Sequence, residues 1–371
     1  MTAVPTFTVS ATTVVTPTGL LEPGEVVVED GVIAEVRPAP ASDRVPRRVL
    51  TPGFLDLQVN GHDDVNCATA VGDDWERMDA LLIAQGVTGW CPTLITAPLD
   101  RFAAPLARIA AAAGRPPAPG RPVILGAHLE GPFLGGAPGA HPRQHLVPLD
   151  LGWLAALPSI VKIVTLAPEL VGATDAIRLL VGRGVLVSLG HSTAGLTESI
   201  AATDAGARLV THLFNGMGPL HHREPGLLGA ALSDDRLTPS LIADGVHVHP
   251  AALRAAARAK GLGGWVVVTD AVAWRDGRLD DRGELRVQVV DGAPRLADGT
   301  LAGSALTMDA AIRRMVEEAG IPLTEAVAAA TSTPARLLGL GDRGRIVPGC
   351  RADLVALDPD ALTIDEVWIA V

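Results

Sequence analysis

The feature of this sequence that most constrains its fold is an alternation of short apolar, β-branched runs with alanine- and leucine-rich stretches. Segments such as 101–114 and 309–320 have helical composition, whereas the runs between them are typical of buried strands. Strands that alternate with helices predict βα units and a parallel sheet. Eight such runs favour a (β/α)8 TIM-like barrel. The runs cover residues 55–60, 87–96, 122–131, 161–169, 184–192, 207–216, 239–248 and 264–271.

Both chain ends have a different pattern. Residues 26–36, VVVEDGVIAEV, consist of two β-rich runs around Asp30-Gly31, a dipeptide that favours a hairpin turn. The last residues of the chain are also β-rich. We therefore expect residues 1–50 and 346–371 to form a small β-sandwich domain, and residues 51–345 to form the barrel. Residues 277–300 predict a hairpin inserted near the barrel mouth.

Charge and composition exclude several classes of function. The net charge is −11 and the sequence has no basic stripe, which argues against a nucleic-acid partner. The three cysteines are scattered, so they predict neither a disulfide framework nor a cysteine-type zinc site. The first residues lack the features of a signal peptide, and no run of about 18 apolar residues is present to span a bilayer. We expect a cytoplasmic protein without a membrane partner.

Titratable side chains recur at the ends of the predicted strands. Glu130, His191, His212, His247 and Asp270 each follow a different apolar run. Taken singly, each has an ordinary structural interpretation, such as a hydrogen-bonded histidine or a helix N-cap for Asp270. In a barrel, however, the carboxyl ends of the strands form one face, which carries the active site. The joint pattern therefore predicts a catalytic site on that face.

The residue types at these strand ends suit metal-assisted hydrolysis. A carboxylate with two imidazoles binds a divalent metal such as zinc and leaves one position for water. A metal in this position lowers the pKa of water toward ~7 and polarises a carbonyl group. Asp270 is then placed to take the proton of the water and to give it to a leaving nitrogen.

Several motifs resemble the N-acetylglucosamine-6-phosphate deacetylases of the amidohydrolase superfamily, and the resemblance covers nearly the whole chain. The entry PGF and the exit PGCRADLVALD match the superfamily in general. The more specific motifs are HLEGPF (128–133), GAH (139–141), GHS (190–192), THLFNGM (211–217), HREPGLLGAA (222–231), ADGVH (243–247), VVTDA (267–271) and LAGSALTM (301–308).

The resemblance implies a role for each matching residue. Asp270 is the catalytic acid and base, and His141 acts close to the acetyl group. The phosphate is held by Asn215 and Gly216, together with Arg223 from the neighbouring subunit of a homodimer. The remaining roles are metal binding by Glu130, His191 and His212, and sugar contacts by Ala140, His141, His247, Leu301, Ala302 and Gly303.

The stretch PGFLDLQVNG, residues 52–61, departs from the H-x-H pattern of many metal-dependent hydrolases, because Gln58 and Asn60 stand in the histidine positions. Amides are weak ligands for first-row divalent metals. Some members of the resembled family carry Q-x-N and use one metal, so we expect one divalent ion per chain. Zinc is the first choice, and iron(II), cobalt and manganese also suit these ligands.

The activity implied by the resemblance is hydrolysis of the acetamide of N-acetylglucosamine 6-phosphate to glucosamine 6-phosphate and acetate. Three alternatives remain open. The first is a deacetylase of another phosphorylated N-acetyl amino sugar, such as the galacto epimer. The second is a cyclic amide hydrolase, for which Lys162 on a predicted strand would have to be the bridging lysine. The third is a catalytically silent scaffold or sensor.

Three segments depart from the family pattern. One is the stretch GGAPGAHPRQH, residues 135–145, which differs around the His141 loop. His62-Asp63-Asp64 follows Asn60-Gly61 and places two carboxylates near the predicted barrel mouth, where an anionic substrate would meet them. We interpret His62 as a surface turn residue rather than a ligand. Trp274 and Arg275, after Asp270, have no role that the sequence predicts.

Overall fold

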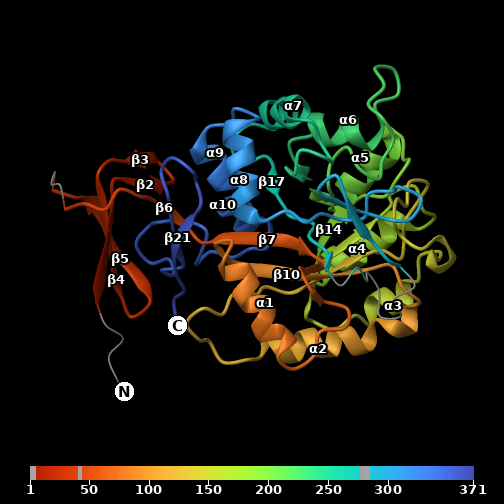
Figure 1. Ribbon diagram of the computed structural model, residues 1–371. Helices are drawn as coiled ribbons and strands as arrows, with labels where there is room; N and C mark the ends of the chain where they lie inside the picture. Colours follow the sequence, from red (N-terminus) through yellow and green to blue (C-terminus); the bar gives the residue numbers. More distant parts are fainter. Residues whose placement is uncertain (1–5, 41–43, 276, 278–284) are drawn as a thin grey trace.

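A computed structural model of the protein describes residues 6–40, 44–275, 277 and 285–371. Parallel strands surrounded by helices form a (β/α)8 barrel, and smaller sheets made by the two chain ends lie beside it (Figure 1). The barrel strands follow one another in chain order, and each lies within a run expected from the sequence or extends it by one residue. They are β7 (Phe54–Val59), β10 (Val87–Ile95), β12 (Ala127–Glu130), β13 (Val161–Leu166), β14 (Leu186–Leu189), β15 (Leu209–Val210), β16 (Thr238–Leu241) and β17 (Val266–Val267). A short strand, β11 (Val123–Ile124), pairs with the start of β10.

The first and last barrel strands meet through their final residues. The Asp270 N–H donates to the Gln58 carbonyl at 3.0 Å, and the Asn60 N–H donates to the Ala271 carbonyl at 2.8 Å. These bonds close the barrel at the end of β7 and beyond the end of β17. They also bring the amides of Gln58 and Asn60 to the carboxylate of Asp270.

The strands form because their residues are apolar and β-branched, and because both sides of each strand are covered. Every residue of β7 is buried, as expected for a strand with helices outside and side chains inside. Leu57 and Val59 join the main apolar core, whereas Asp56 and Gln58 alternate with them and face the barrel interior.

Helices cover the outside of the barrel and bury their apolar faces on the strands. In α8, for example, Met308, Ala311, Ile312 and Met315 are buried at the spacing of one helix face. The helices are α1 (Asp74–Ile83), α2 (Ala103–Ala113), α3 (Leu151–Ala155), α4 (Ala173–Gly182), α5 (Leu196–Ala205), α6 (Gly226–Ser233), α7 (Pro250–Lys260), α8 (Met308–Glu317), α9 (Leu323–Ala330) and α10 (Ser332–Leu337), with short 3-10 turns at Leu99–Arg101 and Arg143–His145.

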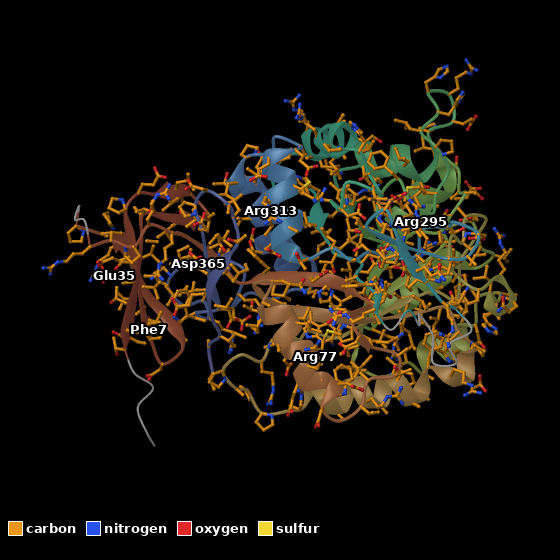
Figure 2. The ribbon with its side chains drawn as sticks, viewed as in Figure 1. Phe7, Glu35, Arg77, Arg295, Arg313 and Asp365 are labelled. Atoms are coloured by element: carbon orange, nitrogen blue, oxygen red, sulfur yellow. The ribbon has the colours of Figure 1, made fainter. Side chains whose placement is uncertain are left out.

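The two chain ends pair into sheets that share one small apolar core. Phe7, Glu35 and Asp365 lie together on this side of the molecule, although Asp365 is near the other end of the chain (Figure 2). One sheet has the order β1-β4-β5 and the other the order β21-β20-β6-β2-β3. The strands are β1 (Phe7–Ala11), β2 (Thr13–Thr16), β3 (Gly19–Leu21), β4 (Gly24–Glu29), β5 (Val32–Pro38), β6 (Val49–Pro52), β20 (Leu354–Leu357) and β21 (Ile364–Trp368). Residues of both sheets, including Val9, Val26, Leu50 and Leu354, form the core between them.

The predicted hairpins are present where the structure describes them. β4 and β5 are antiparallel, and Asp30 and Gly31 between them both have the positive φ of a type I′ turn. In the segment 277–300, β18 (Gln288–Val290) pairs with β19 (Ala293–Arg295), whereas residues 278–284 of that prediction lie outside the described residues. A further short hairpin, β8 (Gly61–His62) with β9 (Val65–Asn66), follows β7. In the described part of the chain, no helix combines the length and the apolar character needed to cross a bilayer.

Candidate active site

A pocket at the carboxyl ends of the barrel strands contains all but one of the predicted site residues. The exception is Arg223, which does not line it. The pocket also has apolar walls, made in part by Ile95, Ile242 and Val272. The predicted residues that line it are Glu130, Ala140, His141, His191, His212, Asn215, Gly216, His247, Asp270, Leu301, Ala302 and Gly303.

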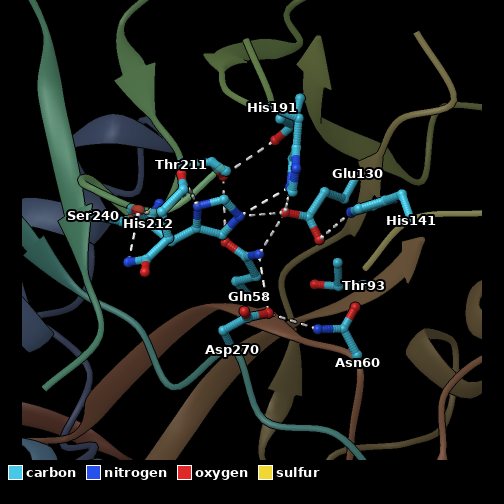
Figure 3. A network of polar contacts seen from close by, with 12 residues as sticks. Gln58, Asn60, Thr93, Glu130, His141, His191, Thr211, His212, Ser240 and Asp270 are labelled. Atoms are coloured by element: carbon cyan, nitrogen blue, oxygen red, sulfur yellow. Dashed lines mark hydrogen bonds and ion pairs between the residues drawn. The ribbon is translucent and has the colours of Figure 1, made fainter. Parts of the chain in front are cut away.

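Glu130, His191 and His212 form a tight buried group, which we name the Glu-His-His cluster (Figure 3). The Glu130 Oε1 atom lies 3.1 Å from His191 Nε2 and 3.0 Å from His212 Nε2. The two Nε2 atoms are 3.0 Å apart. The residues follow β12, β14 and β15, so the ends of three barrel strands direct side chains to one point.

The hydrogen bonds on the far side of each ring indicate what the cluster can bind. The Nδ1 atom of His212 lies 3.1 Å from the Asn215 carbonyl, and that of His191 lies 3.3 Å from the Ala137 carbonyl. A carbonyl only accepts, so we assign the ring proton to Nδ1 in both residues. Both Nε2 atoms then point lone pairs at each other and at a carboxylate oxygen. A divalent cation fits this donor set, and backbone carbonyls behind ligand histidines are the usual supporting contacts.

The cluster is strongly polarised. Burial alone would raise the pKa of Glu130, but the interactions of its carboxylate with the imidazoles of His191 and His212 outweigh burial and hold the pKa well below its usual value. Burial opposes protonation of His212, yet its bond to Glu130 raises the net pKa of the ring. Glu130 is therefore a carboxylate whose negative charge attracts positive charge to the centre of the pocket.

Asp270 faces this cluster and is held by the two amides that replace histidines in the sequence. Its Oδ1 atom accepts a hydrogen bond from Asn60 Nδ2 at 2.8 Å and from Gln58 Nε2 at 3.1 Å. Gln58 Nε2 also donates to Glu130 Oε1 at 2.9 Å. Burial, and next the charge of Glu130, raise the pKa of Asp270 to about 8. Gln58 and Asn60 thus act as hydrogen-bond donors that tie Asp270 to the cluster.

His141 is a neutral imidazole aimed at the same point. Its Nδ1 atom accepts from the Thr96 N–H at 3.4 Å and lies 2.8 Å from the Thr96 hydroxyl. We therefore assign its proton to Nε2, which is 3.7 Å from Glu130 Oε2. Burial, and next the neighbouring His191, lower the pKa of His141 to about 3. The ring is an uncharged donor at neutral pH.

A layer of hydrogen bonds lies beneath the site and fixes Gln58. Its Oε1 atom accepts from the Thr211 hydroxyl at 3.3 Å, and Thr211 is bonded to Thr165 at 3.3 Å. Thr165 is in turn 2.8 Å from His128 Nε2. Burial lowers the pKa of His128 to about 4, so the ring is neutral. Its ring has structural partners on both nitrogens, the second being the Leu57 carbonyl at 3.0 Å.

Three of the site residues have left-handed backbone conformations. The φ angles are +50° at His191, +30° at His212 and +50° at Asp270. Such conformations are uncommon for residues other than glycine and are concentrated at functional sites, where the surrounding structure holds them. The strands therefore end in sharp turns that direct these side chains into the pocket.

The substrate-side residues occupy the rim of the same pocket. His247 is oriented by Asp244, whose Oδ2 atom lies 2.6 Å from His247 Nδ1. Burial alone would raise the pKa of the half-buried Asp244, but the contact with His247 helps to outweigh burial and lowers the pKa. Asn215 bonds back to the His212 and Leu213 carbonyls at 3.3 Å. Opposite them, Ala140, Val272 and Ala302 belong to one small apolar cluster.

Arg223 lies away from the pocket, in the exposed segment 219–224. This segment precedes α6 and projects from the barrel (Figure 1). Its Nη1 atom is 2.9 Å from His222 Nε2. Lys162 is also outside the site, because its side chain is exposed on β13. It therefore does not provide the bridging ligand of a two-metal cyclic amide hydrolase.

The interpretation of His62 as a surface turn residue is wrong. His62 is buried, with 7% of its surface exposed, and it pairs with Val65 in the β8–β9 hairpin. It lines no part of the pocket. Asp63 is buried as well, and its carboxylate is paired with Arg275 at 2.6 Å and Arg77 at 3.0 Å. The structure thus gives Arg275 a partner that the sequence did not indicate.

Sequence reasoning missed the residues that support the site. Thr96 holds His141, Asp244 holds His247, and Gln58 with Asn60 holds Asp270. Thr96 and Asp244 follow β10 and β16, so the rule of polar residues at strand ends would have found them. The partner of Thr96 was not readable, because His141 lies 45 residues away, whereas Asp244 is only three residues from His247.

Comparison with known proteins gives a consistent result. Residues 49–370 match the model of the amidohydrolase family. The chain is 41% identical to the N-acetylgalactosamine-6-phosphate deacetylase of Escherichia coli O157:H7, over 98% of both chains. It is also 41% identical to the N-acetylglucosamine-6-phosphate deacetylase of Bos taurus, over 87% of this chain and 82% of the relative.

A solved structure shows the same fold. An aspartate-to-alanine variant of N-acetyl-D-glucosamine-6-phosphate deacetylase from Mycobacterium smegmatis, in complex with N-acetyl-D-glucosamine-6-phosphate, superposes with a TM-score of 0.89 at 34% identity, covering 99% of this chain and 98% of that one. With its barrel, its buried Glu-His-His cluster and these relatives, the chain belongs to the amidohydrolase family.

Proposed function

We propose that this protein hydrolyses the acetamide of N-acetylglucosamine 6-phosphate to glucosamine 6-phosphate and acetate. The observation that carries the proposal is the convergence of the Glu-His-His cluster, Asp270 and His141 in one pocket. The family match and the named relatives, most of them N-acetylglucosamine-6-phosphate deacetylases, support the substrate.

The cluster is proposed to hold one divalent cation, with zinc as the first candidate. When bound, such an ion polarises a carbonyl group and lowers the pKa of water. Its ligands are Glu130, His191 and His212. Gln58 and Asn60 are not ligands in this proposal, because their amide N–H groups are already directed at Glu130 and Asp270.

Asp270 is proposed to move the proton. In its ionised form the carboxylate takes a proton from the water that attacks the acetyl carbonyl, and afterwards returns it to the amine nitrogen that departs. Both amide donors are on Oδ1. Among the described residues, Oδ2 has no such donor, and it is the oxygen left for the proton.

His141 is proposed to stabilise the charge that develops on the acetyl oxygen. Its Nε2–H is an uncharged donor fixed from behind by Thr96. A preorganised donor of this kind favours the transition state over the planar ground state of the amide. The apolar residues Ile95 and Val272 limit the water around the reacting group.

The phosphate is proposed to lie against Asn215 and Gly216, with Arg223 supplied by a second copy of the chain. Arg223 is exposed and outside its own pocket, which agrees with a role in a neighbouring site. Light scattering should then give the mass of a dimer. Mixed dimers of Arg223→Ala and Asp270→Asn should regain activity, since one of their two sites has both residues intact; no recovery would count against the shared site.

N-Acetylgalactosamine 6-phosphate is the second candidate substrate. The relative from Escherichia coli O157:H7, which is aligned over 98% of this chain, is named for that epimer. The two sugars differ only in the configuration of one hydroxyl, so the same cluster and base serve either.

The test combines metal counting with acetate release. Purified protein is analysed for metal per chain and assayed with both 6-phosphates and with unphosphorylated N-acetylglucosamine. We expect about one metal per chain and a higher kcat/KM for N-acetylglucosamine 6-phosphate than for the other two. Faster turnover of the galacto epimer would assign the second candidate. A metal-loaded protein that releases acetate from none of them would refute the proposal and favour a silent scaffold.

A further inference from the structure

One barrel strand contributes nothing to the pocket lining, yet a carboxylate follows it. Among the eight barrel strands of the described chain, only β13 has an end that supplies no residue to the lining. Its sequence continues as Ala167-Pro168-Glu169. Glu169 is half-buried and lies between the loops that follow the two neighbouring strands, β12 and β14.

Glu169 is bonded to both of these loops. From the loop after β14, the Ser192 hydroxyl donates to Oε2 at 2.6 Å and the Thr193 N–H donates to Oε1 at 2.8 Å. From the loop after β12, the Gly136 N–H donates to Oε1 at 3.1 Å. Hydrogen bonds to a charged carboxylate are roughly twice as strong as neutral ones. One side chain therefore ties two separate loops together.

Each of these loops carries residues of the proposed site. The first, 135–141, ends at His141, and the second begins at His191. The loops also contact each other directly, because the Gly135 N–H donates to the His191 carbonyl at 2.8 Å and His191 Nδ1 faces the Ala137 carbonyl. Glu169 accepts hydrogen bonds from Gly136 and Ser192, the residues that directly follow Gly135 and His191 in the two loops.

Steric detail shows that the loops are built around Glu169. A Cβ atom on Gly135 would lie 2.0 Å from Glu169 Oε1. A Cβ atom on Gly136 would lie 2.3 Å from the Thr193 hydroxyl. Only glycine allows the backbone of the first loop to approach the carboxylate and the second loop so closely.

We propose that Glu169 is a positioning residue, which fixes His141 and His191 relative to each other by clamping the loops after β12 and β14. It touches neither substrate nor ion. This inference rests on the proposed function for its effect on turnover, but its effect on the loops is independent of that function.

The mutational test uses three variants. Glu169→Ala removes all the acceptors, and Glu169→Gln keeps the shape and the oxygen that accepts from Thr193 and Gly136. The matched control is Glu198→Ala, which deletes an exposed carboxylate at the start of α5, near the same loop.

Displacement of catalytic groups by about 1 Å costs on the order of 10²-fold in rate. In metal-saturated protein, well below the melting temperature, we expect Glu169→Ala to lose about 10²-fold in kcat/KM. Glu169→Gln should regain most of this loss, and Glu198→Ala should behave as the parent protein.

Hydrogen exchange measured by mass spectrometry separates the clamp from general stability and from the proposed reaction. In Glu169→Ala, we expect faster exchange in peptides covering 134–141 and 191–195, with unchanged exchange in the barrel strands, and a weaker affinity for zinc. Uniformly faster exchange, or unchanged loops with unchanged zinc affinity, would overturn the inference. If the parent protein releases no acetate, the proposed function fails, while exchange and zinc affinity still decide whether Glu169 is a clamp.

Discussion

Asp270 combines burial, a left-handed backbone and two amide donors, and each of these constrains what a substitution does. Asp270→Asn keeps the size of the side chain but removes its capacity to take a proton. General acid–base catalysis contributes about 10²–10⁴-fold to rate. We expect kcat to fall by that order, while calorimetry shows substrate affinity within a few-fold of the parent. Turnover close to that of the parent would exclude Asp270 as the base.

Asn60 should set the pH range in which Asp270 works. Its amide donates to the charged form of Asp270 and so lowers a pKa that burial has raised to about 8. Asn60→Ala removes this donor, so the pKa of Asp270 should rise further. Since the base must be ionised, the acid limb of the kcat/KM profile should move to higher pH, by about one unit if the bond contributes about 1.4 kcal/mol. A limb that stays in place or moves down would show that another group controls it.

For single residues, the residue types at strand ends predicted which side chains line the pocket. The hydrogen bonds between these side chains and their supporting residues were not predictable. Glu130, His191, His212 and Asp270 were found because each polar residue interrupts an apolar run. The protonation of His141 depends on Thr96, which is 45 residues away. His62 is buried in the β8–β9 hairpin, a pairing that the sequence analysis did not predict.

Among the elements, the β8–β9 turn illustrates how tertiary pairing neutralises charge. Asp63 has a φ of +55° and contacts Arg77, on α1, and Arg275, in the loop after Asp270. Both arginines are about half exposed, with 48% and 62% of their side-chain surface accessible, so solvent weakens these pairs.

Asp63→Asn tests this pairing, because asparagine tolerates the left-handed backbone and lacks the charge. We expect the free energy of unfolding in urea to fall by about 1 kcal/mol or less. KM for the phosphorylated substrate should stay unchanged, since a paired carboxylate does not repel it. A marked drop in KM would mean that Asp63 does act on the anion. Asp64→Asn, at a more exposed neighbour, is the matched control.

The elements themselves were largely predictable, because their signals are local. Apolar runs fixed the positions of the barrel strands, and the Asp30-Gly31 dipeptide fixed the hairpin turn. Strand lengths were not predictable: β15 and β17 have two residues each within runs of ten and eight. Those strands stop early because His212 and Asp270 turn the backbone into the pocket, which is a requirement of the site and not of strand propensity.

For the whole molecule, the closed barrel makes the site and the fold interdependent. The cluster draws its members from three strands, and the Gln58–Asp270 contact spans the closure between the first and the last. The sequence predicted the barrel from its repeat of strands, but it could not show that ring closure would bring Gln58 to Asp270. Binding at the cluster should consequently stabilise the entire fold.

Removal of the ion is the global test of this coupling. Without a cation, three buried donor atoms point their lone pairs at one another, whereas an ion that binds only the folded state adds about 4 kcal/mol at a thousand times its Kd. For a chain of this size, that corresponds to a melting temperature lower by about 5 °C after chelation. Calorimetry should show this drop, and zinc should reverse it. His191→Ala should abolish the difference between chelated and zinc-loaded protein, whereas His145→Ala, outside the cluster, should retain it. Equal melting temperatures for the chelated and zinc-loaded parent protein would show that the cluster holds no ion.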